Sequence, residues 1–225
     1  MQHIRFNQHL QVTPSKIVCI GRNYVEHIHE LGNDIPDDIV VFIKPNSAIN
    51  NQLNSVHLQQ TLHYEAELCF VVENGLFTAV GLGFDLTKRQ LQSQLKSKGL
   101  PWERAKAFNG SAVFSDFVSI NQHTQGGDKQ HWSFSLTVDG QLTQLGHSQL
   151  MIYSPNEILA EVSDFLTLES GDIVMTGTPK GVGEVKSGGV FELTLWQGIE
   201  YHSEAQLIHD IAQTQPLLKQ QWLAI

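Results

Sequence analysis

The stretch His63–Glu73, HYEAELCFVVE, decides the fold because its side chains alternate between two chemical types. The even positions are largely apolar, whereas the odd positions include Glu65, Glu67 and Glu73. Successive side chains of a β-strand point to opposite faces of the sheet. We therefore predict a strand with one face in the core and another that presents carboxylates. The turn sequence Glu73-Asn74-Gly75 then leads into a predicted partner strand, Phe77–Asp85.

Further strands are predicted on both sides of this hairpin. They are Lys16–Ile20, Ile39–Ile43, Trp132–Val138 with a return to Leu145 after Asp139-Gly140, Ile173–Thr176, Val190–Leu195 and His202–Ile208. Helices are predicted at Tyr24–Leu31, at Thr87–Lys98, and from the capping residue Ser154 to about Leu166. Because strands outnumber helices, we expect a β-rich sheet or barrel with a few flanking helices.

The bulk composition limits the possible partners and compartment. The chain has 225 residues, which suits one domain over 1–225, and a formal net charge of −9. An acidic chain is not expected to bind nucleic acid, which is held by clustered cations. We see neither a secretory signal nor an apolar run of the ~20 residues that span a bilayer, so we expect no membrane partner and a cytoplasmic location. Cys19 and Cys69 each lie in an apolar run and are expected to be buried free thiols.

The carboxylates of the deciding stretch are candidate metal ligands. Glu65 and Glu67 share one strand face and repel each other unless a cation lies between them. Asp85 ends the predicted partner strand and can close the same site if the two strands pair. Such an all-oxygen set favours Mg²⁺ or Mn²⁺ over zinc. The alternatives are a solvated strand face for the two glutamates and a helix cap for Asp85.

Two further segments can carry chemistry. His27 and Glu30 are three residues apart and share a helix face, so Glu30 can orient the imidazole as a general base. His29 points elsewhere and is expected to face solvent. The loop 176–183, TGTPKGVG, exposes backbone N–H groups and a hydroxyl that suit a carboxylate, although it matches no P-loop or dinucleotide fingerprint. A surface ion pair and a tight turn are the respective alternatives.

In their order and spacing, these segments resemble the fumarylacetoacetate hydrolase family, in its short branch of acylpyruvases and oxaloacetate-handling proteins. The resemblance covers about residues 16–208, with a C-terminal tail at about 209–225. It is carried by Gly21-Arg22-Asn23-Tyr24 with His27 and Glu30, Phe42-Ile43-Lys44-Pro45, His63–Leu68, Asp85–Arg89, Lys98–Trp102 with Lys106, and Gly171-Asp172-Ile173 leading into Thr176–Gly183.

The resemblance implies the α+β, β-rich fold of the family's C-terminal domain, a mixed sheet roll or barrel with a few flanking helices. It also implies a homodimer and one Mg²⁺ or Mn²⁺ per chain held by Glu65, Glu67 and Asp85. It implies catalytic roles for His27, Glu30 and Lys106, with the first two on a mobile loop that becomes a short lid helix when ligand binds. The positions that it implies for substrate binding are Arg22, Phe42, Lys44, Arg89, Gln92 and Thr178.

The implied activity is that of a metal-dependent enzyme acting on small α-keto or 1,3-dicarbonyl acids. A divalent ion can act as a Lewis acid toward the keto oxygen of such a substrate. Hydrolysis of a carbon–carbon bond in an acylpyruvate is the first expectation. Decarboxylation or keto–enol tautomerisation of oxaloacetate is the alternative at the same site. A metal-binding protein without activity is disfavoured, because His27 and Glu30 are both present.

Overall fold

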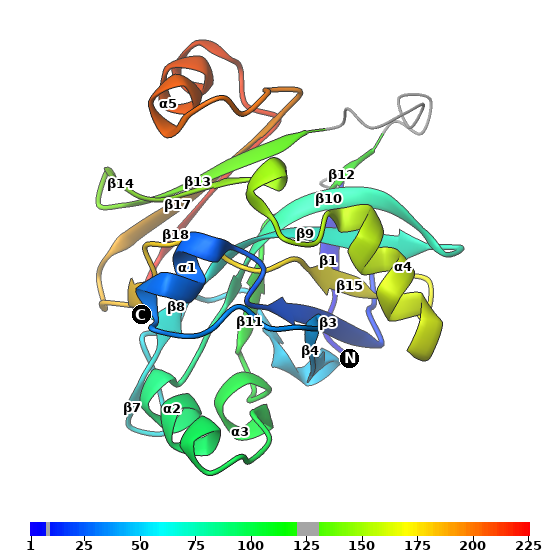
Figure 1. Ribbon diagram of the computed structural model, residues 1–225, viewed down its shortest axis with the longest axis vertical. Coiled ribbons are helices and arrows are strands. Elements are labelled where there is room, and N and C mark those ends of the chain that lie inside the picture. The colour runs from blue at the N-terminus through cyan, green and yellow to red at the C-terminus, as the bar shows by residue number, and fades with distance from the viewer. Residues whose placement is uncertain (8–9, 121–130) are drawn as a thin grey trace.

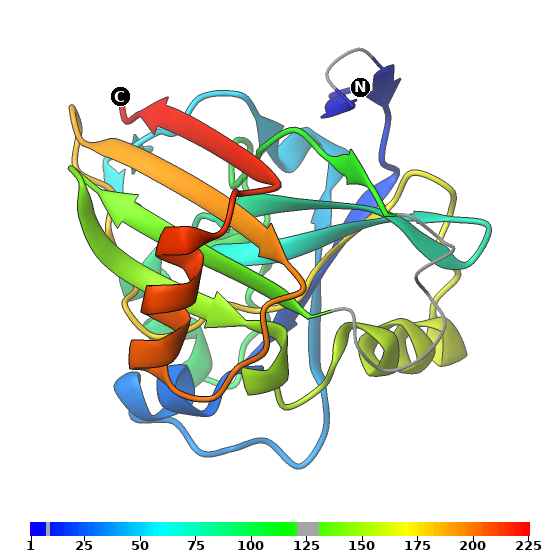
Figure 2. The same cartoon turned by 90° about the horizontal axis from the view of Figure 1, so that it is seen from above.

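The computed structural model describes residues 1–7, 10–120 and 131–225. Two sheets dominate it, and the smaller one lies across the larger one (Figure 1, Figure 2). The larger sheet is mixed, with the strand order β4-β3-β15-β9-β10-β11-β5 and with β12 pairing beside β10. The smaller sheet has the order β14-β13-β17-β18. This arrangement confirms the expected β-rich α+β class.

The strands and helices have the following bounds. The larger sheet comprises β3 (Lys16–Gly21), β4 (Val40–Pro45), β5 (Ile49–Asn50), β9 (Ala66–Glu73), β10 (Leu76–Asp85), β11 (Ala112–Phe114), β12 (Val118–Ser119) and β15 (Ile173–Met175). The smaller sheet comprises β13 (Trp132–Val138), β14 (Gln141–His147), β17 (Val190–Gln197) and β18 (Leu218–Leu223). The strand pairs outside these sheets are β1 (Ile4–Phe6) with β2 (Leu10–Val12), β6 (Val56–His57) with β7 (Gln60–Thr61), and β8 (His63–Tyr64) with β16 (Gly183–Glu184). The helices are α1 (Val25–Glu30), α2 (Arg89–Ser97), α3 (Glu103–Lys106), α4 (Pro155–Phe165) and α5 (Glu204–Gln213), with short 3₁₀ turns at Asn46–Ala48 and Ser148–Leu150.

The main core lies between the two sheets. Leu68 and Phe70 of β9 pack in one buried cluster with Phe134 of β13 and with Phe191 and Leu193 of β17. The opposite face of β9 is also buried, because Cys69 and Val71 belong to a second cluster. The predicted strand therefore has two buried faces beyond Glu67, and its carboxylate face is confined to its first residues. Both cysteines are buried and free, as expected.

Most predicted elements are present with small shifts at their ends. The predicted strand His63–Glu73 is divided at Glu65 into β8 and β9. Its turn is formed by Asn74 and Gly75, both with positive φ, which is the geometry of a tight hairpin. The predicted capping box also forms, since Ser154 Oγ accepts from Glu157 N and Glu157 accepts from Ser154 N.

The predicted strand His202–Ile208 is wrong, because the segment forms most of helix α5. Ser203 Oγ accepts a hydrogen bond from Gln206 N and caps this helix. Leu207 then packs against Trp196 on the outer face of the smaller sheet. Beyond α5, the expected tail adds the edge strand β18 to that sheet. None of the helices in the described ranges has the length and apolar character needed to span a bilayer.

Asp172 joins the starts of the parallel neighbours β3 and β15. Its buried carboxylate accepts hydrogen bonds from Ser15 N at 2.9 Å, Lys16 N at 3.1 Å and Glu169 N at 2.9 Å, and it pairs with the Lys16 ammonium. Burial by itself raises the pKa of Asp172, but the hydrogen bonds from Lys16, Ser15 and Glu169 outweigh it and leave this pKa below its ordinary value.

We expect Asp172→Asn to lower the free energy of unfolding by about 2–4 kcal/mol at pH 7, because the Lys16 ammonium and several donors lose a charged acceptor. The folded-state pKa is depressed, so this stability is present above the unfolded value of about 4 and is lost as pH falls through the folded value. Urea unfolding of both proteins at pH 7 and in acid measures the difference, which should shrink in acid. The exposed Asp164→Asn is the control, and a difference that does not depend on pH would contradict this account.

Candidate metal and active site

The three predicted metal ligands converge where β9 and β10 pair. Glu65 immediately precedes β9, Glu67 lies within it, and Asp85 ends β10. The antiparallel register places Glu67 opposite Gly83, and Asp85 N donates to Glu65 O at 2.9 Å. One carboxylate oxygen from each residue lies within 4.8 Å of the other two, and all three side chains are buried. This separation permits one shared ion.

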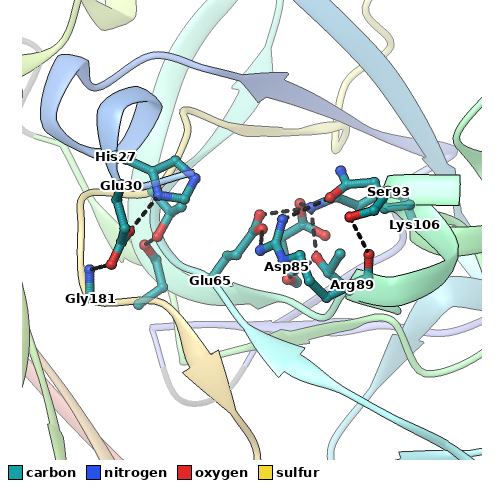
Figure 3. A network of polar contacts seen from close by, with 12 residues as sticks. His27, Glu30, Glu65, Asp85, Arg89, Ser93, Lys106 and Gly181 are labelled. Atoms are coloured by element: carbon teal, nitrogen blue, oxygen red, sulfur yellow. Dashed lines mark hydrogen bonds and ion pairs between the residues drawn. The ribbon is translucent and has the colours of Figure 1, made fainter. Parts of the chain in front are cut away.

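Three cationic side chains surround this carboxylate cluster (Figure 3). Lys106 Nζ of α3 donates to Glu65 Oε2 at 2.7 Å and to Asp85 Oδ2 at 2.5 Å. Arg89 of α2 donates to Glu65 Oε1. Lys44 Nζ of β4 lies 2.8 Å from Asp85 Oδ1. Each carboxylate of this cluster except Glu67 is therefore paired with a cation among the described residues.

The pKa values of the two glutamates in the cluster are shifted in opposite directions. Burial raises the pKa of Glu65, but the Lys106 and Arg89 charges outweigh burial and hold that pKa well below its usual range. The pKa of Glu67 is raised well above its usual range, first by burial and then by the Asp85 and Glu65 charges. Gly177 N donates to Glu67 Oε2 at 2.8 Å and offsets only part of this effect.

The donor set fits a hard divalent cation. Glu65, Glu67 and Asp85 offer only oxygen atoms, which Mg²⁺ and Mn²⁺ prefer. Lys44 Nζ lies 2.8 Å from the buried Asp85 Oδ1 but not in hydrogen-bonding geometry, so among the described residues this oxygen has an ion pair and no hydrogen bond. A cation between the carboxylates would balance the charge that raises the pKa of Glu67.

A histidine–glutamate pair faces the carboxylate cluster from α1. His27 Nδ1 lies 3.0 Å from Glu30 Oε2, and Glu30 Oε1 accepts from Gly181 N at 2.9 Å. The predicted helix is therefore formed and rests on the loop 176–183. His27 is buried, whereas His29 is exposed as predicted. Figure 3 shows the pair and the carboxylate cluster on opposite sides of the site.

Asn23 fixes the chain just before α1. Its Nδ2 donates to Tyr153 O at 2.9 Å and to Thr176 O at 2.8 Å, and its Oδ1 accepts from Tyr153 N at 2.7 Å. All side-chain polar atoms of this buried asparagine are thus used. The start of α1 is held to the end of β15 and to the segment before α4.

One cavity joins these groups and encloses about 430 Å³, part of it open to solvent. Its lining includes most of the predicted site residues, namely Arg22, His27, Phe42, Glu65, Glu67, Asp85, Arg89, Gln92, Lys106 and Thr178.

Two predicted site residues do not line the cavity. Glu30 contacts His27 and Gly181 and does not line the cavity. Lys44 was expected at the pocket lining, but it is fully buried below Asp85, where its Nζ donates to Lys106 O and to Ser111 O. The structure therefore gives Lys44 a position that supports Asp85 and Lys106 rather than a place in the lining.

Several residues of the site are not among those predicted from the sequence. Lys96, Asn33 and Trp102 line the cavity. Lys96 could have been predicted from the sequence, because it follows Gln92 by four residues and shares a face of the predicted helix. No local sequence pattern indicates that Gln144 belongs to the site, because it lies on a strand of the smaller sheet.

Gln144 joins two parts of the site from β14. Its Oε1 accepts from Ala66 N at 3.0 Å, between the two glutamates. Its Nε2 donates to Thr178 Oγ1 at 2.9 Å and to Pro179 O at 2.8 Å. Thr178 Oγ1 in turn donates to Ala66 O at 2.8 Å. The glutamate strand and the loop 176–183 are therefore held in one register.

The sequence matches relatives that are named for activities on oxaloacetate. The oxaloacetate tautomerase YcgM of Escherichia coli is 37% identical over 80% of this chain and 88% of its own length. The mitochondrial oxaloacetate tautomerase FAHD1 of Bos taurus is 38% identical over 76% and 82%. An oxaloacetate decarboxylase of Dictyostelium discoideum is 35% identical over 80% and 88%.

Solved structures of related proteins also match the fold of this chain. A candidate fumarylacetoacetate isomerase/hydrolase from Oleispira antarctica matches all of both chains, with a TM-score of 0.85 and 31% identity. A fumarylpyruvate hydrolase from Pseudomonas aeruginosa, in complex with Mn²⁺ and pyruvate, matches 86% of this chain and 91% of its own, with a TM-score of 0.78 and 28% identity. The family model for the fumarylacetoacetate (FAA) hydrolase C-terminal region matches residues 16–210. This chain is therefore an enzyme that belongs to the fumarylacetoacetate hydrolase family.

Proposed function

We propose that this chain catalyses the keto–enol tautomerisation of oxaloacetate with one Mg²⁺ or Mn²⁺ held by Glu65, Glu67 and Asp85. The observation that carries the proposal is the cavity that joins this carboxylate cluster to His27. The names of the relatives support an oxaloacetate activity better than the first expectation, acylpyruvate hydrolysis.

Glu65, Glu67 and Asp85 would hold the ion at one end of the cavity. When bound, the ion supplies Lewis-acid chemistry that stabilises negative charge on the keto oxygen of an α-keto acid. The carboxylates hold the ion, and Lys44 and Arg89 keep Asp85 and Glu65 in place. Lys106 adds a positive charge beside the same two carboxylates and stabilises developing negative charge on the substrate.

His27 moves the proton in this proposal. Glu30 accepts from Nδ1, so the lone pair of Nε2 is available toward the cavity. Nε2 takes a proton from carbon 3 of the keto form while the C2–C3 double bond forms, and the protonated Nε2 then gives this proton to the oxygen on carbon 2, which returns His27 to its neutral form. No atom is gained or lost, so neither water nor a co-reactant is needed. Arg89, Gln92 and Thr178 are proposed to contact the bound acid from the cavity wall.

Hydrolysis of acylpyruvates remains a second candidate. The observation that favours it is the same His27–Glu30 pair, which can activate a water molecule as well as accept a carbon-bound proton. The fold is also shared with a fumarylpyruvate hydrolase. The two candidates differ in whether His27 acts on the substrate or on water.

Glu67→Gln tests the metal site. We expect it to weaken Mn²⁺ binding at least about tenfold, because the glutamate with the raised pKa loses its charge and one ligand oxygen. Mn²⁺ titration followed by electron paramagnetic resonance measures this directly. Glu73→Gln is the matched control, since it makes the same change at the exposed end of the same strand. EDTA should abolish the activity of the wild type, and Mg²⁺ or Mn²⁺ should restore it.

His27→Ala tests the proton transfer. We expect kcat/KM for oxaloacetate tautomerisation to fall by about 10²–10⁴-fold, because the general base is lost. The ultraviolet absorbance of the enol measures the rate. His29→Ala is the matched control, because His29 is exposed on the same helix. Oxaloacetate decarboxylation should suffer less, since its charge is accepted mainly at the metal.

The comparison of substrates separates the two candidates. If the wild type hydrolyses acetylpyruvate far faster than it tautomerises oxaloacetate, and if His27→Ala removes that hydrolysis, the hydrolase candidate replaces our proposal. If His27→Ala leaves tautomerisation unchanged, His27 is not the proton carrier.

A further inference from the structure

One end of the cavity carries positive charge that no carboxylate balances. Arg22 Nη2 and Lys96 Nζ both donate to Asn33 Oδ1, at 3.4 and 2.6 Å, so the two charged groups lie side by side. Within the part of the chain that the structure describes, no carboxylate lies within ion-pair distance of either. Their shared acceptor is a neutral amide oxygen. This end of the cavity, formed by Arg22, Lys96 and Asn33, is called the cationic end below.

Arg22 is held in an unusual way. Its φ of 56° is in the left-handed region, which is costly for a residue other than glycine. Such backbone strain concentrates at ligand-binding positions. In the described chain its Nε is buried and has no hydrogen-bond acceptor. Arg22 thus lines the cavity with a guanidinium group of which one buried donor has no acceptor in the described chain.

Lys96 reaches the cavity from α2. It lies four residues after Gln92 and seven after Arg89, so the three side chains share one helix face. Its ammonium lies 5.8 Å from the ring centroid of Trp102, which also lines the cavity. Burial and then the Arg22 and Arg89 charges lower the pKa of Lys96. A bound anion would relieve this crowding of like charges.

The overall charge of the cavity leads to the same conclusion. Its lining carries four cationic side chains, Arg22, Arg89, Lys96 and Lys106, against the three carboxylates of the cluster. A divalent ion at the cluster would add to the positive excess. A ligand with two negative charges would balance this cavity better than a ligand with one.

We propose that Arg22 and Lys96, aligned by Asn33, bind the second carboxylate of a dicarboxylic keto acid. The proposal deepens the proposed function and rests on it for the position of the α-keto acid end, which lies at Glu65, Glu67 and Asp85. It distinguishes four-carbon dicarboxylates such as oxaloacetate from monocarboxylate acylpyruvates such as acetylpyruvate, which carry a neutral ketone in place of the second carboxylate. It makes Lys96 a specificity-determining residue.

Binding of two unreactive probes tests the proposal. Malate and its C4 amide have nearly the same shape, and only malate carries the second carboxylate. Calorimetric titration of the Mg²⁺-loaded wild type should show malate binding at least about tenfold tighter than the amide. Lys96→Met should weaken malate binding by about 10–100-fold, because a charge-assisted hydrogen bond is lost, and change amide binding less than about threefold.

Two matched variants control for charge and fold. Lys98→Met makes the same change two residues away at an exposed position and should leave both affinities unchanged. Lys96→Arg keeps the charge and should retain most of the preference for malate. Mn²⁺ affinity should be the same in all variants, since Lys96 does not contact the carboxylate cluster.

The outcomes are distinguishable from those of the proposed function, because the probes are not turned over. Equal binding of malate and the amide by the wild type would overturn the proposal, as would an equal loss of both in Lys96→Met. If malate preference depends on Lys96 but oxaloacetate is not tautomerised, the cationic end stands and the proposed function fails.

Discussion

Three carboxylates buried side by side on two paired strands set the condition that the rest of the site must meet. Removing one carboxylate from water costs several kcal/mol unless it is paired, and like charges within 4.8 Å add to that cost. Three separate segments supply cations that pair with these carboxylates, namely Lys44 of β4, Arg89 of α2 and Lys106 of α3. Glu67 still has a raised pKa. The cluster therefore fits an added cation better than it fits a closed network of ion pairs.

The loop 176–183 connects the carboxylate cluster to the other parts of the site. Gly177 N binds Glu67, and Gly181 N binds Glu30, so one loop sets the distance between the carboxylate cluster and the His27–Glu30 pair. Gly181 has a φ of 97°, and a Cβ there would lie 2.1 Å from Thr143 O. Only glycine permits this approach, which brings the loop against β14. Gln144 of the same strand then anchors the loop to Ala66.

The sequence predicted those parts of the site that follow from local periodicity. Strand alternation and antiparallel pairing brought Glu65, Glu67 and Asp85 together, and helical spacing paired His27 with Glu30. Prediction from the sequence failed for segments whose structure or contacts depend on packing against the smaller sheet. His202–Ile208 also alternates as a strand does, but burial of Leu207 against Trp196 selects the helix, and the Ser203–Gln206 cap was overlooked. Gln144 contacts Ala66 across 78 positions, which no local pattern can indicate.

Substrate choice and reaction choice are linked in such a site. Both candidate reactions begin with an α-keto acid at the carboxylate cluster and His27 nearby, so the group beyond carbon 3 decides what His27 can do. In an acylpyruvate that group is a ketone, which an activated water can attack. In oxaloacetate it is a carboxylate, whose carbon is a poor electrophile, especially when it pairs with Arg22 and Lys96. Proton transfer at carbon 3 then remains open to His27, whereas hydrolysis does not. A cationic end that selects the dicarboxylate would thereby also disfavour carbon–carbon bond hydrolysis.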